Sequence, residues 1–396
     1  MRLLHTSDWH LGRTFKSVGM LGVQERALDH LIDVVRAERV EAVLVSGDVY
    51  DRAVPGPEAV ALLSTTLERL VDAGAQVVLS SGNHDSAIRL GFASGLLRRS
   101  GVHLSTSVAG VGHAVHLGEV AIYPIPYLEP AVCADALGAQ RRTHAAVMAA
   151  AMDRVRAAHR GGPAVVMAHS VVTGAQTCDS ERDISVGGVS AVPADTFAGM
   201  SYAALGHLHG AQRVGESAAY SGSPYAMSFG EATHIKSWTL VDLDASGAAR
   251  TEWVPVPVER PLARLRGRLA DLLSDPRHTA AEGAWCSVVL TDPQRPVGAM
   301  DRVRARFPHA IELGFAPEGQ ATERRSYASR VAGREAVDIC CDFLAHVRGG
   351  LAAGPVERAE LRRALEESRL GAAERDGEGL AAPGVASAGG STGAVA

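Results

Sequence analysis

The stretch Ala42 to Asp51, AVLVSGDVYD, constrains the fold of this chain more than any other part of its sequence. Its first four residues form a short apolar run rich in β-branched side chains, which is typical of a buried parallel strand. Gly47 allows a tight turn, so the carboxylate of Asp48 is expected just past the carboxyl edge of the strand, where open α/β sheets bind ligands. Taken alone, the pattern is more often an ordinary turn. The same arrangement, however, recurs at four other predicted strand ends.

Strands and helices are expected to alternate through the first 255 residues. Helical spacing of apolar residues predicts helices at 24–39, 57–72 and 140–159. Strands are expected at 3–4, 42–45, 76–79, 120–125, 164–168, 204–206, 218–222 and 235–243, the last two as closing strands of a second sheet. This order predicts a layered α/β fold with right-handed crossovers.

A proline-interrupted segment, WVPVPVE at 253–259, is expected to be an extended connector between domains. Residues 1–255 would then form the first domain and residues 256–350 a small α+β cap domain. The cap should contain an Arg-rich helix at 260–275, a strand at 284–290, a helix at 298–306 and a strand at 309–315. A charged amphipathic helix at 357–369 lies in segment 351–370, and the Gly-, Ala- and Ser-rich tail 371–396 is expected to be disordered.

Composition limits the location more than it limits the function. No apolar run approaches the ~20 residues of a membrane span, and no signal peptide precedes the first predicted strand. The five cysteines show no C-x-x-C spacing, which predicts a reducing cytoplasm. The formal net charge of −5 weakens a nucleic-acid-binding hypothesis without excluding it, because a local basic patch matters more than the sum.

Metal-ligand residues follow five of the predicted strands. They are Asp8, His10, Asp48, Asn83, His169, His207 and His209. Carboxylate, imidazole and amide groups without a thiolate suit Mn²⁺ or Fe²⁺ better than a structural zinc. The set is too large for one ion and suits two ions about 3.5–4 Å apart, which activate water for attack on phosphorus. Each motif alone has a structural alternative, such as loop imidazoles or a core histidine, but their recurrence favours a metal centre.

His84 is expected to face the substrate rather than the metal, because it follows Asn83 on the opposite side of an extended backbone. A histidine there could stabilise developing charge or protonate the leaving alkoxide. Asp85 could orient its ring.

The motifs D-x-H, G-D-x-x-D, G-N-H-D, a lone histidine after a strand, and G-H-x-H occur in the order that resembles the calcineurin-like metallophosphoesterase superfamily. The blocks LLHTSDWHLGR, VVLSSGNHDSAIRL and VVLTDPQRPVGAMDRVRARFPHAIEL resemble more closely the SbcD family of bacterial nuclease subunits, as does the late segment FLAHVRGGLAAGPVERAELRRALEES. The resemblance covers about residues 1–370.

This resemblance implies the calcineurin-like phosphoesterase fold, a two-sheet sandwich flanked by helices, with a small C-terminal cap. It also implies the two ligand sets and the catalytic histidine. One ion would be held by Asp8, His10, Asp48 and His209, and the other by Asp48, Asn83, His169 and His207. His84 would be catalytic, and Asp51 would lie behind the ligands without being one.

The resemblance further implies two Mn²⁺ ions, with Mg²⁺ or Fe²⁺ as substitutes. The implied reactions are 3′-to-5′ exonuclease cleavage of duplex DNA and endonuclease cleavage of single strands and hairpins, in DNA repair, recombination and replication. The implied assembly is a homodimer bound to a coiled-coil ATPase of the SbcC type.

Basic residues near the metal motifs are candidates for DNA phosphate contacts, namely Arg13, Lys16 and Arg89. Arginines at 260–268 and 302–306 are further candidates, although solvated helix faces explain them equally well. Segment 86–99 is a candidate homodimer contact. Leu361, Leu365 and Leu370 lie on one side of the last helix, which could bind the ATPase or the chain's own cap.

Two other functions use the same features. One is a phosphoesterase for small phosphodiesters, against which the cap and its Arg-rich clusters argue. The other is a non-catalytic scaffold that binds DNA ends, against which His84 argues, because a structural metal site needs no histidine facing substrate.

Overall fold

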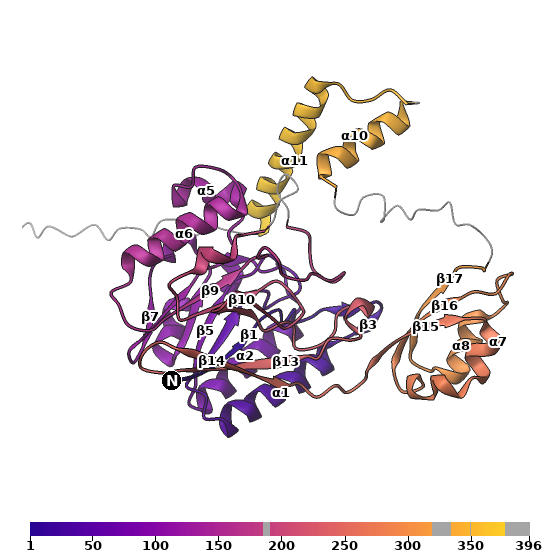
Figure 1. Ribbon diagram of the computed structural model, residues 1–396, viewed down its shortest axis with the longest axis horizontal. Coiled ribbons are helices and arrows are strands. Elements are labelled where there is room, and N and C mark those ends of the chain that lie inside the picture. The colour runs from indigo at the N-terminus through magenta and orange to yellow at the C-terminus, as the bar shows by residue number, and fades with distance from the viewer. Residues whose placement is uncertain (185–190, 319–333, 349, 377–396) are drawn as a thin grey trace, which may run out of the picture.

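Two six-stranded sheets pack face to face in the body of the protein (Figure 1). The computed structural model describes residues 1–184, 191–318, 334–348 and 350–376. The first sheet contains, in spatial order, β14 (Ala249–Pro255), β13 (Ser237–Leu243), β1 (Arg2–Thr6), β4 (Ala42–Ser46), β5 (Gln76–Ser80) and β6 (Val102–Ser105). Strands β1, β4, β5 and β6 run parallel, which confirms the predicted strands at 3–4, 42–45 and 76–79.

The second sheet is built from the middle of the chain. In spatial order it contains β11 (Gln212–Val214), β12 (Ala218–Tyr220), β10 (Tyr202–Gly206), β9 (Ala164–His169), β8 (Val120–Pro124) and β7 (Val115–Leu117). The strand predicted at 235–243 exists, but its assignment to the second sheet is wrong, because as β13 it pairs antiparallel with β1 in the first. An apolar pattern predicts a strand but does not select its partner.

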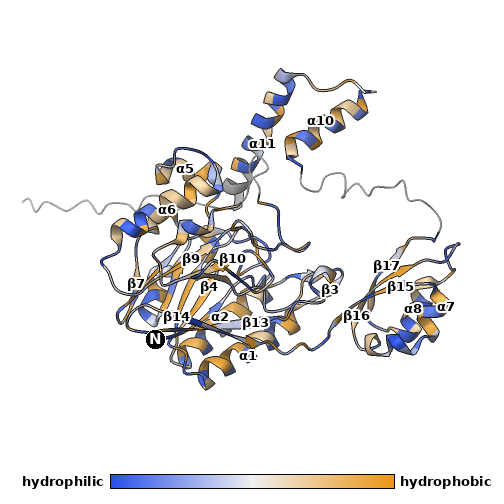
Figure 2. Cartoon of the chain, in the orientation of Figure 1, coloured by the Kyte–Doolittle hydropathy of each residue, from blue (hydrophilic) through white to orange (hydrophobic). Residues whose placement is uncertain are grey.

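The central parallel strands, such as β4, β9 and β10, are buried on both faces, whereas the edge strand β6 is only partly buried. In β4, Leu44 faces the second sheet in a core shared with Met167, whereas Val43 and Val45 face the helices. Period-two alternation makes this double burial possible, and it explains why the strands read as continuous apolar runs. Figure 2 shows the same concentration of hydrophobic residues along the central strands.

Helices cover both outer faces of the sandwich. α1 (Leu21–Ala37) and α2 (Pro57–Asp72) pack on the first sheet, and α5 (Pro130–Leu137) and α6 (His144–Ala158) pack on the second. Two short helices, α3 (Ala87–Leu90) and α4 (Ser94–Leu97), follow β5. A hairpin of β2 (Thr14–Phe15) and β3 (Val18–Gly19) precedes α1. The sandwich flanked by helices therefore matches the predicted fold.

The cap holds a three-stranded parallel sheet of β15 (Leu262–Gly267), β16 (Trp285–Leu290) and β17 (Ala310–Phe315). α7 (Leu269–Ser274) and α8 (Ala299–Arg306) pack on it. The helix predicted over 260–275 is wrong for residues 262–267. There Leu265 is buried while Arg264 and Arg266 are exposed, a period-two pattern that pairs with β16. Residues 253–255 of the expected connector pair within β14, and the division into domains stays a prediction.

Two helices end the described chain, α10 (Ala336–Val347) and α11 (Pro355–Asp376). α11 contains the helix predicted at 357–369 and continues through residues 371–376, where the tail is expected to begin. The remaining tail, 377–396, lies outside the described residues. α11 lies beside α5, where Arg142 pairs with Glu366 at 3.5 Å. None of the helices in the described ranges has the length and apolar character needed to cross a membrane.

Candidate metal centre

The carboxyl ends of the parallel strands bring the seven predicted ligands together between the two sheets. Their ligand atoms form two groups, Asp8 with His10 and His209, and Asp48 with His169 and His207, each with atoms within 4.8 Å of one another. Asp48 lies between the groups: its Oδ2 is 3.5 Å from His10 Nε2 and 3.4 Å from His169 Nε2. A carboxylate in this place could bridge two ions.

Asn83 completes the second group. Its Oδ1 lies 2.9 Å from His169 Nε2 and 3.1 Å from His207 Nδ1, so three ligand atoms converge on one point. The Nδ2 of Asn83 lacks a hydrogen-bond partner among the described residues, and the ring nitrogens of buried His10 have only carboxylate oxygens of Asp51 and Asp48 at 3.4 and 3.5 Å, without hydrogen-bond geometry. Buried polar atoms are rarely left unpaired, and the oxygen and nitrogen donors here suit a divalent cation of intermediate hardness.

Backbone strain is concentrated at the ligands. In the described chain, seven non-glycine residues have positive φ, and four of them are Asp8 (54°), His10 (42°), Asp48 (50°) and His207 (97°). Each such residue costs on the order of 1–3 kcal/mol in backbone strain, and it persists only where the surrounding structure holds it in that conformation. Such strain is typical of functional sites, and its presence at four predicted ligands supports a centre that the fold maintains against a local cost.

Three glycines let the strand ends approach one another at this centre. A Cβ on Gly82 would lie 2.2 Å from both the backbone nitrogen and Oδ1 of Asp48. One on Gly47 would lie 2.3 Å from His169 Nδ1, and one on Gly206 would lie 1.9 Å from the carbonyl oxygen of Ser46. No side chain fits at these positions, so the ligand spacing depends on glycine.

Asp85 ties the loops after β4 and β5 together. Its carboxylate accepts hydrogen bonds from the backbone nitrogens of Gly82 (2.9 Å), Val49 (3.1 Å) and Tyr50 (2.9 Å). The expectation that Asp85 orients His84 is therefore wrong. The ring of His84 is instead held through Nδ1 by the carbonyl oxygen of Asp51, at 2.8 Å.

His84 stands at the edge of the centre and is only half-buried, whereas the predicted ligands are buried. Its backbone nitrogen donates to Asp48 Oδ1 at 2.8 Å, and its ring lies 4.7 Å from that of His10. Because Nδ1 is bonded to a carbonyl oxygen, Nε2 is the atom left for a substrate.

Asp51 lies next to the predicted ligand His10 and to Arg13. Its Oδ1 is 3.4 Å from His10 Nδ1 and 3.3 Å from the guanidinium of Arg13. A carboxylate on the far nitrogen of a ligating histidine orients the ring.

Burial and charge set the protonation of the ligands. Burial raises the pKa of Asp8 to about 6. Burial also acts to raise the pKa of Asp48, but the imidazolium of His169 outweighs it and holds that pKa well below its usual value. Against burial, Asp48 in turn raises the pKa of His169 to about 9. The positive charge of protonated His169 stabilises the carboxylate form of Asp48, and a bound cation would replace that charge.

A buried ion pair behind His209 is not foreseen from the sequence. Ser180 Oγ lies 2.8 Å from His209 Nδ1 and donates to Glu231 at 2.6 Å. Glu231 also accepts from the ammonium of Lys236, which donates to the carbonyl oxygen of His209 at 2.9 Å. This chain of contacts holds Nδ1 and leaves Nε2 of His209 for a metal. The one available signal is that Lys236 is one of only two lysines in the chain.

Gln24 is a second unforeseen support. It is fully buried on α1, and its Nε2 donates to the carbonyl oxygen of His10 at 2.9 Å while its Oε1 accepts from the nitrogen of Gly12 at 3.0 Å. It therefore holds the strained loop that carries His10.

The three candidate DNA contacts lie in different surroundings. Arg13 is largely buried beside Asp51, and Lys16 pairs with Glu312 of the cap at 2.7 Å. Arg89 is exposed and donates to the carbonyl oxygen of Ala53 at 3.2 Å. Arg182, which the sequence analysis misses, is exposed and donates to the carbonyl oxygen of Asn83 at 3.2 Å.

Known proteins resemble the chain over most of its length. The calcineurin-like phosphoesterase family matches residues 1–210, and a type 5 capsule protein repressor C-terminal domain matches residues 258–348. Three relatives are named as the SbcD component of the nuclease SbcCD. Those from Escherichia coli K12 and Rhodobacter capsulatus are 33% and 36% identical and cover 76% and 75% of this chain and 82% of their own length. The Bacillus subtilis relative is 32% identical over 82% of this chain and 88% of its own length.

Replacing Gly82 by alanine should lower the free energy of unfolding by about 1–3 kcal/mol and abolish tight Mn²⁺ binding, because the new methyl group collides with Asp48. Thermal melting and calorimetric Mn²⁺ titration measure both effects. Gly95→Ala is the matched control, because a Cβ there meets no atom within 4 Å. Unchanged Mn²⁺ affinity in Gly82→Ala would contradict the role of this close approach.

Proposed function

The chain belongs to the SbcD family of nuclease subunits within the calcineurin-like phosphoesterases, and from this premise we propose that it cuts DNA with two manganese ions. The observation that carries the proposal is the convergence of seven ligand residues on both sides of Asp48, with His84 beside them. We propose the ligand sets Asp8, His10, Asp48 and His209 for one ion, and Asp48, Asn83, His169 and His207 for the other.

When bound, the two ions would neutralise charge on the scissile phosphate and acidify a water molecule for in-line attack. The residues of the chain do the remaining work. The carbonyl oxygen of Asp51 accepts a hydrogen bond from Nδ1 of His84, so the proton on Nε2 of a protonated ring stays available to a substrate. His84 then donates that proton to the leaving 3′ oxygen, and Asp48 holds its backbone in place.

The proposed products follow the family pattern: 3′-to-5′ shortening of duplexes, and endonuclease cuts in single strands and hairpins. The cap is a candidate for selecting DNA over small phosphodiesters, because it adjoins the loop carrying His10. Phe15 of the hairpin lies 5.7 Å from Trp285 of the cap, ring to ring. We also propose the domain division expected from the sequence: the first domain at 1–255, the cap at 256–350 and the segment of the last helix at 351–370.

The test is digestion of an end-labelled blunt duplex and a hairpin with Mn²⁺, Mg²⁺ or EDTA. We expect cutting with Mn²⁺ and none with EDTA. His84→Ser should keep its metal content, measured by mass spectrometry, but lose about 10²–10⁴-fold in rate, because it lacks the proton donor. Unchanged cutting by this variant would rule out the catalytic role of His84. Hydrolysis of bis(p-nitrophenyl) phosphate without any cutting of DNA would favour the small-substrate alternative.

A homodimer is supported by an apolar face between α2 and α3–α4. A groove of about 590 Å³ there is lined by Leu63, Leu67 and Leu97, and Phe92 and Leu96 beside it are 80% and 67% exposed. A face that carries both a groove and protruding apolar side chains can be self-complementary about a two-fold axis, as an isologous dimer requires.

Phe92→Asp combined with Leu96→Asp should convert the dimer to a monomer, because each charge would be buried without a partner. Light scattering after gel filtration measures the mass. Val297→Asp is the control, because Val297 is exposed on the cap away from this face. A dimer that survives the double substitution would place the interface elsewhere.

An SbcC-type ATPase is the proposed partner of the C-terminal helices. The stripe of Leu361, Leu365 and Leu370 is only half-exposed, whereas Phe343 and Val347 on α10 are 60% and 64% exposed. An amphipathic helix with such an apolar face suits a coiled-coil partner.

Phe343→Glu should therefore reduce co-purification of the chain with its ATPase at least about tenfold, which corresponds to ~1.4 kcal/mol of binding free energy. The rate of bis(p-nitrophenyl) phosphate hydrolysis should not change. Ile235→Glu, which alters an exposed apolar residue of the first domain, serves as control. Equal losses in both variants would argue against α10 as the docking helix.

We also propose a cytoplasmic location. None of the five cysteines forms a disulfide in the described part of the chain, as is usual in a reducing compartment.

A further inference from the structure

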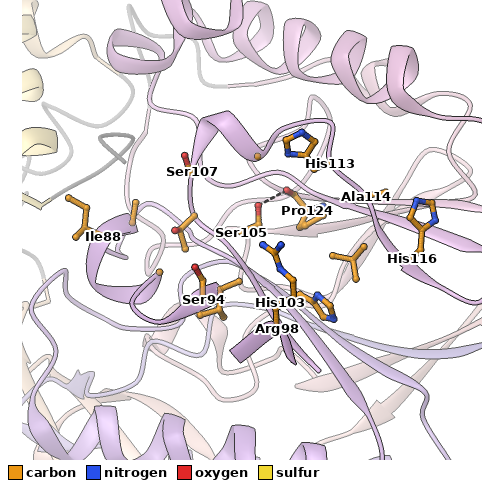
Figure 3. A pocket seen from close by; sticks show the side chains of 16 residues that line it. Ile88, Ser94, Arg98, His103, Ser105, Ser107, His113, Ala114, His116 and Pro124 are labelled. Atoms are coloured by element: carbon orange, nitrogen blue, oxygen red, sulfur yellow. Dashed lines mark hydrogen bonds between the residues drawn. The ribbon is translucent and has the colours of Figure 1, made fainter. Parts of the chain in front are cut away.

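A second cavity, with none of the predicted ligands in its lining, lies between the outer strands of the two sheets (Figure 3). β6 is the edge strand of the first sheet and β7 is the edge strand of the second. The space between them, here named the sheet-edge groove, has a volume of about 830 Å³ and is bounded on one side by α3 and α4. This volume falls within the range of ligand sites, which is about 300–1,000 Å³.

The charged and titratable side chains that line the sheet-edge groove are all basic. They are Arg98, His103, His113 and His116, and its lining contains no Asp or Glu. The formal net charge of −5 counts histidine as neutral, and on the same count the lining carries one positive charge, that of Arg98, and no negative charge, which favours an anionic ligand. Figure 3 shows the side chain of Arg98 reaching into the groove toward Ser105 and Pro124.

Hydroxyl groups supply the neutral donors of the groove. They belong to Ser94, Thr106 and Ser107, whereas the hydroxyl of Ser105, also in the lining, donates to the carbonyl oxygen of Pro124 at 2.8 Å. Arginine and hydroxyl side chains are among the groups that contact phosphate oxygens in protein–DNA complexes. Phe, Tyr and Trp are missing from the lining, so the groove offers no large aromatic surface on which bases would stack. The chemistry therefore favours phosphates over bases.

The sheet-edge groove begins beside the metal centre. Ser105, at the end of β6, pairs with Ser80 at the end of β5, and its carbonyl oxygen accepts from the nitrogen of Ser81 at 3.1 Å. The loop that continues from Ser81 carries Asn83 and His84. Strands that run parallel end at one edge of a sheet, so the groove opens on the same edge as the predicted ligands.

We propose that the sheet-edge groove binds the sugar–phosphate backbone of a single DNA strand that passes the metal centre. This inference rests on the proposed nuclease function and adds a binding site outside the ligand set. Arg98 contacts a phosphate, and the hydroxyl groups of Thr106 and Ser107, in the loop after β6, contact the next. Because the bases are not read, binding in the groove is independent of sequence and depends on salt.

The test uses the full chain and a fluorescent twelve-nucleotide oligothymidylate in EDTA, so that binding is measured without cleavage. Arg98→Glu should raise Kd at least about tenfold at 100 mM salt, the size of one lost charge-assisted contact. It should also reduce the slope of log K against log salt by about 0.7, the value for one phosphate contact on a single strand. Arg99→Glu is the matched control, because this neighbouring exposed arginine does not line the groove.

Equal effects of the two substitutions on Kd and on the slope would overturn the inference, because only general charge would then matter. Displacement of the oligonucleotide by an acidic peptide that binds Arg98 more tightly would overturn it in favour of a protein ligand.

Melting curves and hydrolysis of bis(p-nitrophenyl) phosphate should stay unchanged in Arg98→Glu, which separates binding from folding and chemistry. If the wild type cuts DNA while Arg98→Glu binds normally, the groove inference alone fails. If binding depends on Arg98 but no DNA is cut, the nuclease proposal alone fails.

Discussion

Close approach of backbone to side chain at the strand ends is the constraint on which the centre depends. Gly47, Gly82 and Gly206 sit where any Cβ would overlap a ligand residue or the strand that carries one. Their missing side chains let Asp48 lie against the loop after β5 and let His169 lie against the turn after β4. The strained conformations of Asp8, His10, Asp48 and His207 persist because packing leaves them no alternative.

Buried charge gives the centre its affinity for cations. Asp8 and Asp48 are taken out of water among imidazoles, and the shared protons only partly compensate their charge. The supports behind the ligands, Gln24, Glu231 and Lys236, are themselves buried and held by hydrogen bonds. Such supports hold the ligands in a fixed geometry and therefore lower the entropy lost when ions bind.

The sequence is sufficient to predict the parallel strands that carry the ligands, and the residues at their ends, but not the parallel edge strand β6. Continuous β-branched runs that stop at Gly-Asp or Gly-Asn leave few alternatives for β4 and β5. Long-range pairing is harder to predict: nothing local assigns β13 to β1, or Lys236 to Glu231 and His209. The charged residues of β15 are typical of a solvated helix face, so its sequence predicts a helix. The segment is a strand because it pairs with β16, a contact that the local sequence does not reveal. Asp85 likewise bonds three backbone nitrogens rather than its neighbour, which sequence adjacency hides.

The β2–β3 hairpin joins two regions that differ in chemistry. The hairpin directly follows the strained loop that carries His10. Its buried Phe15 packs beside Trp285 of the cap, and its Lys16 forms an ion pair with Glu312 of the cap. Contacts between the cap and this hairpin can also stabilise the loop that carries His10. Thermodynamic linkage is reciprocal, so an ion bound to that loop would then stabilise the docked cap to the same extent. Any free energy by which the docked cap stabilises the His10 loop would therefore appear equally in the affinity of that loop for an ion.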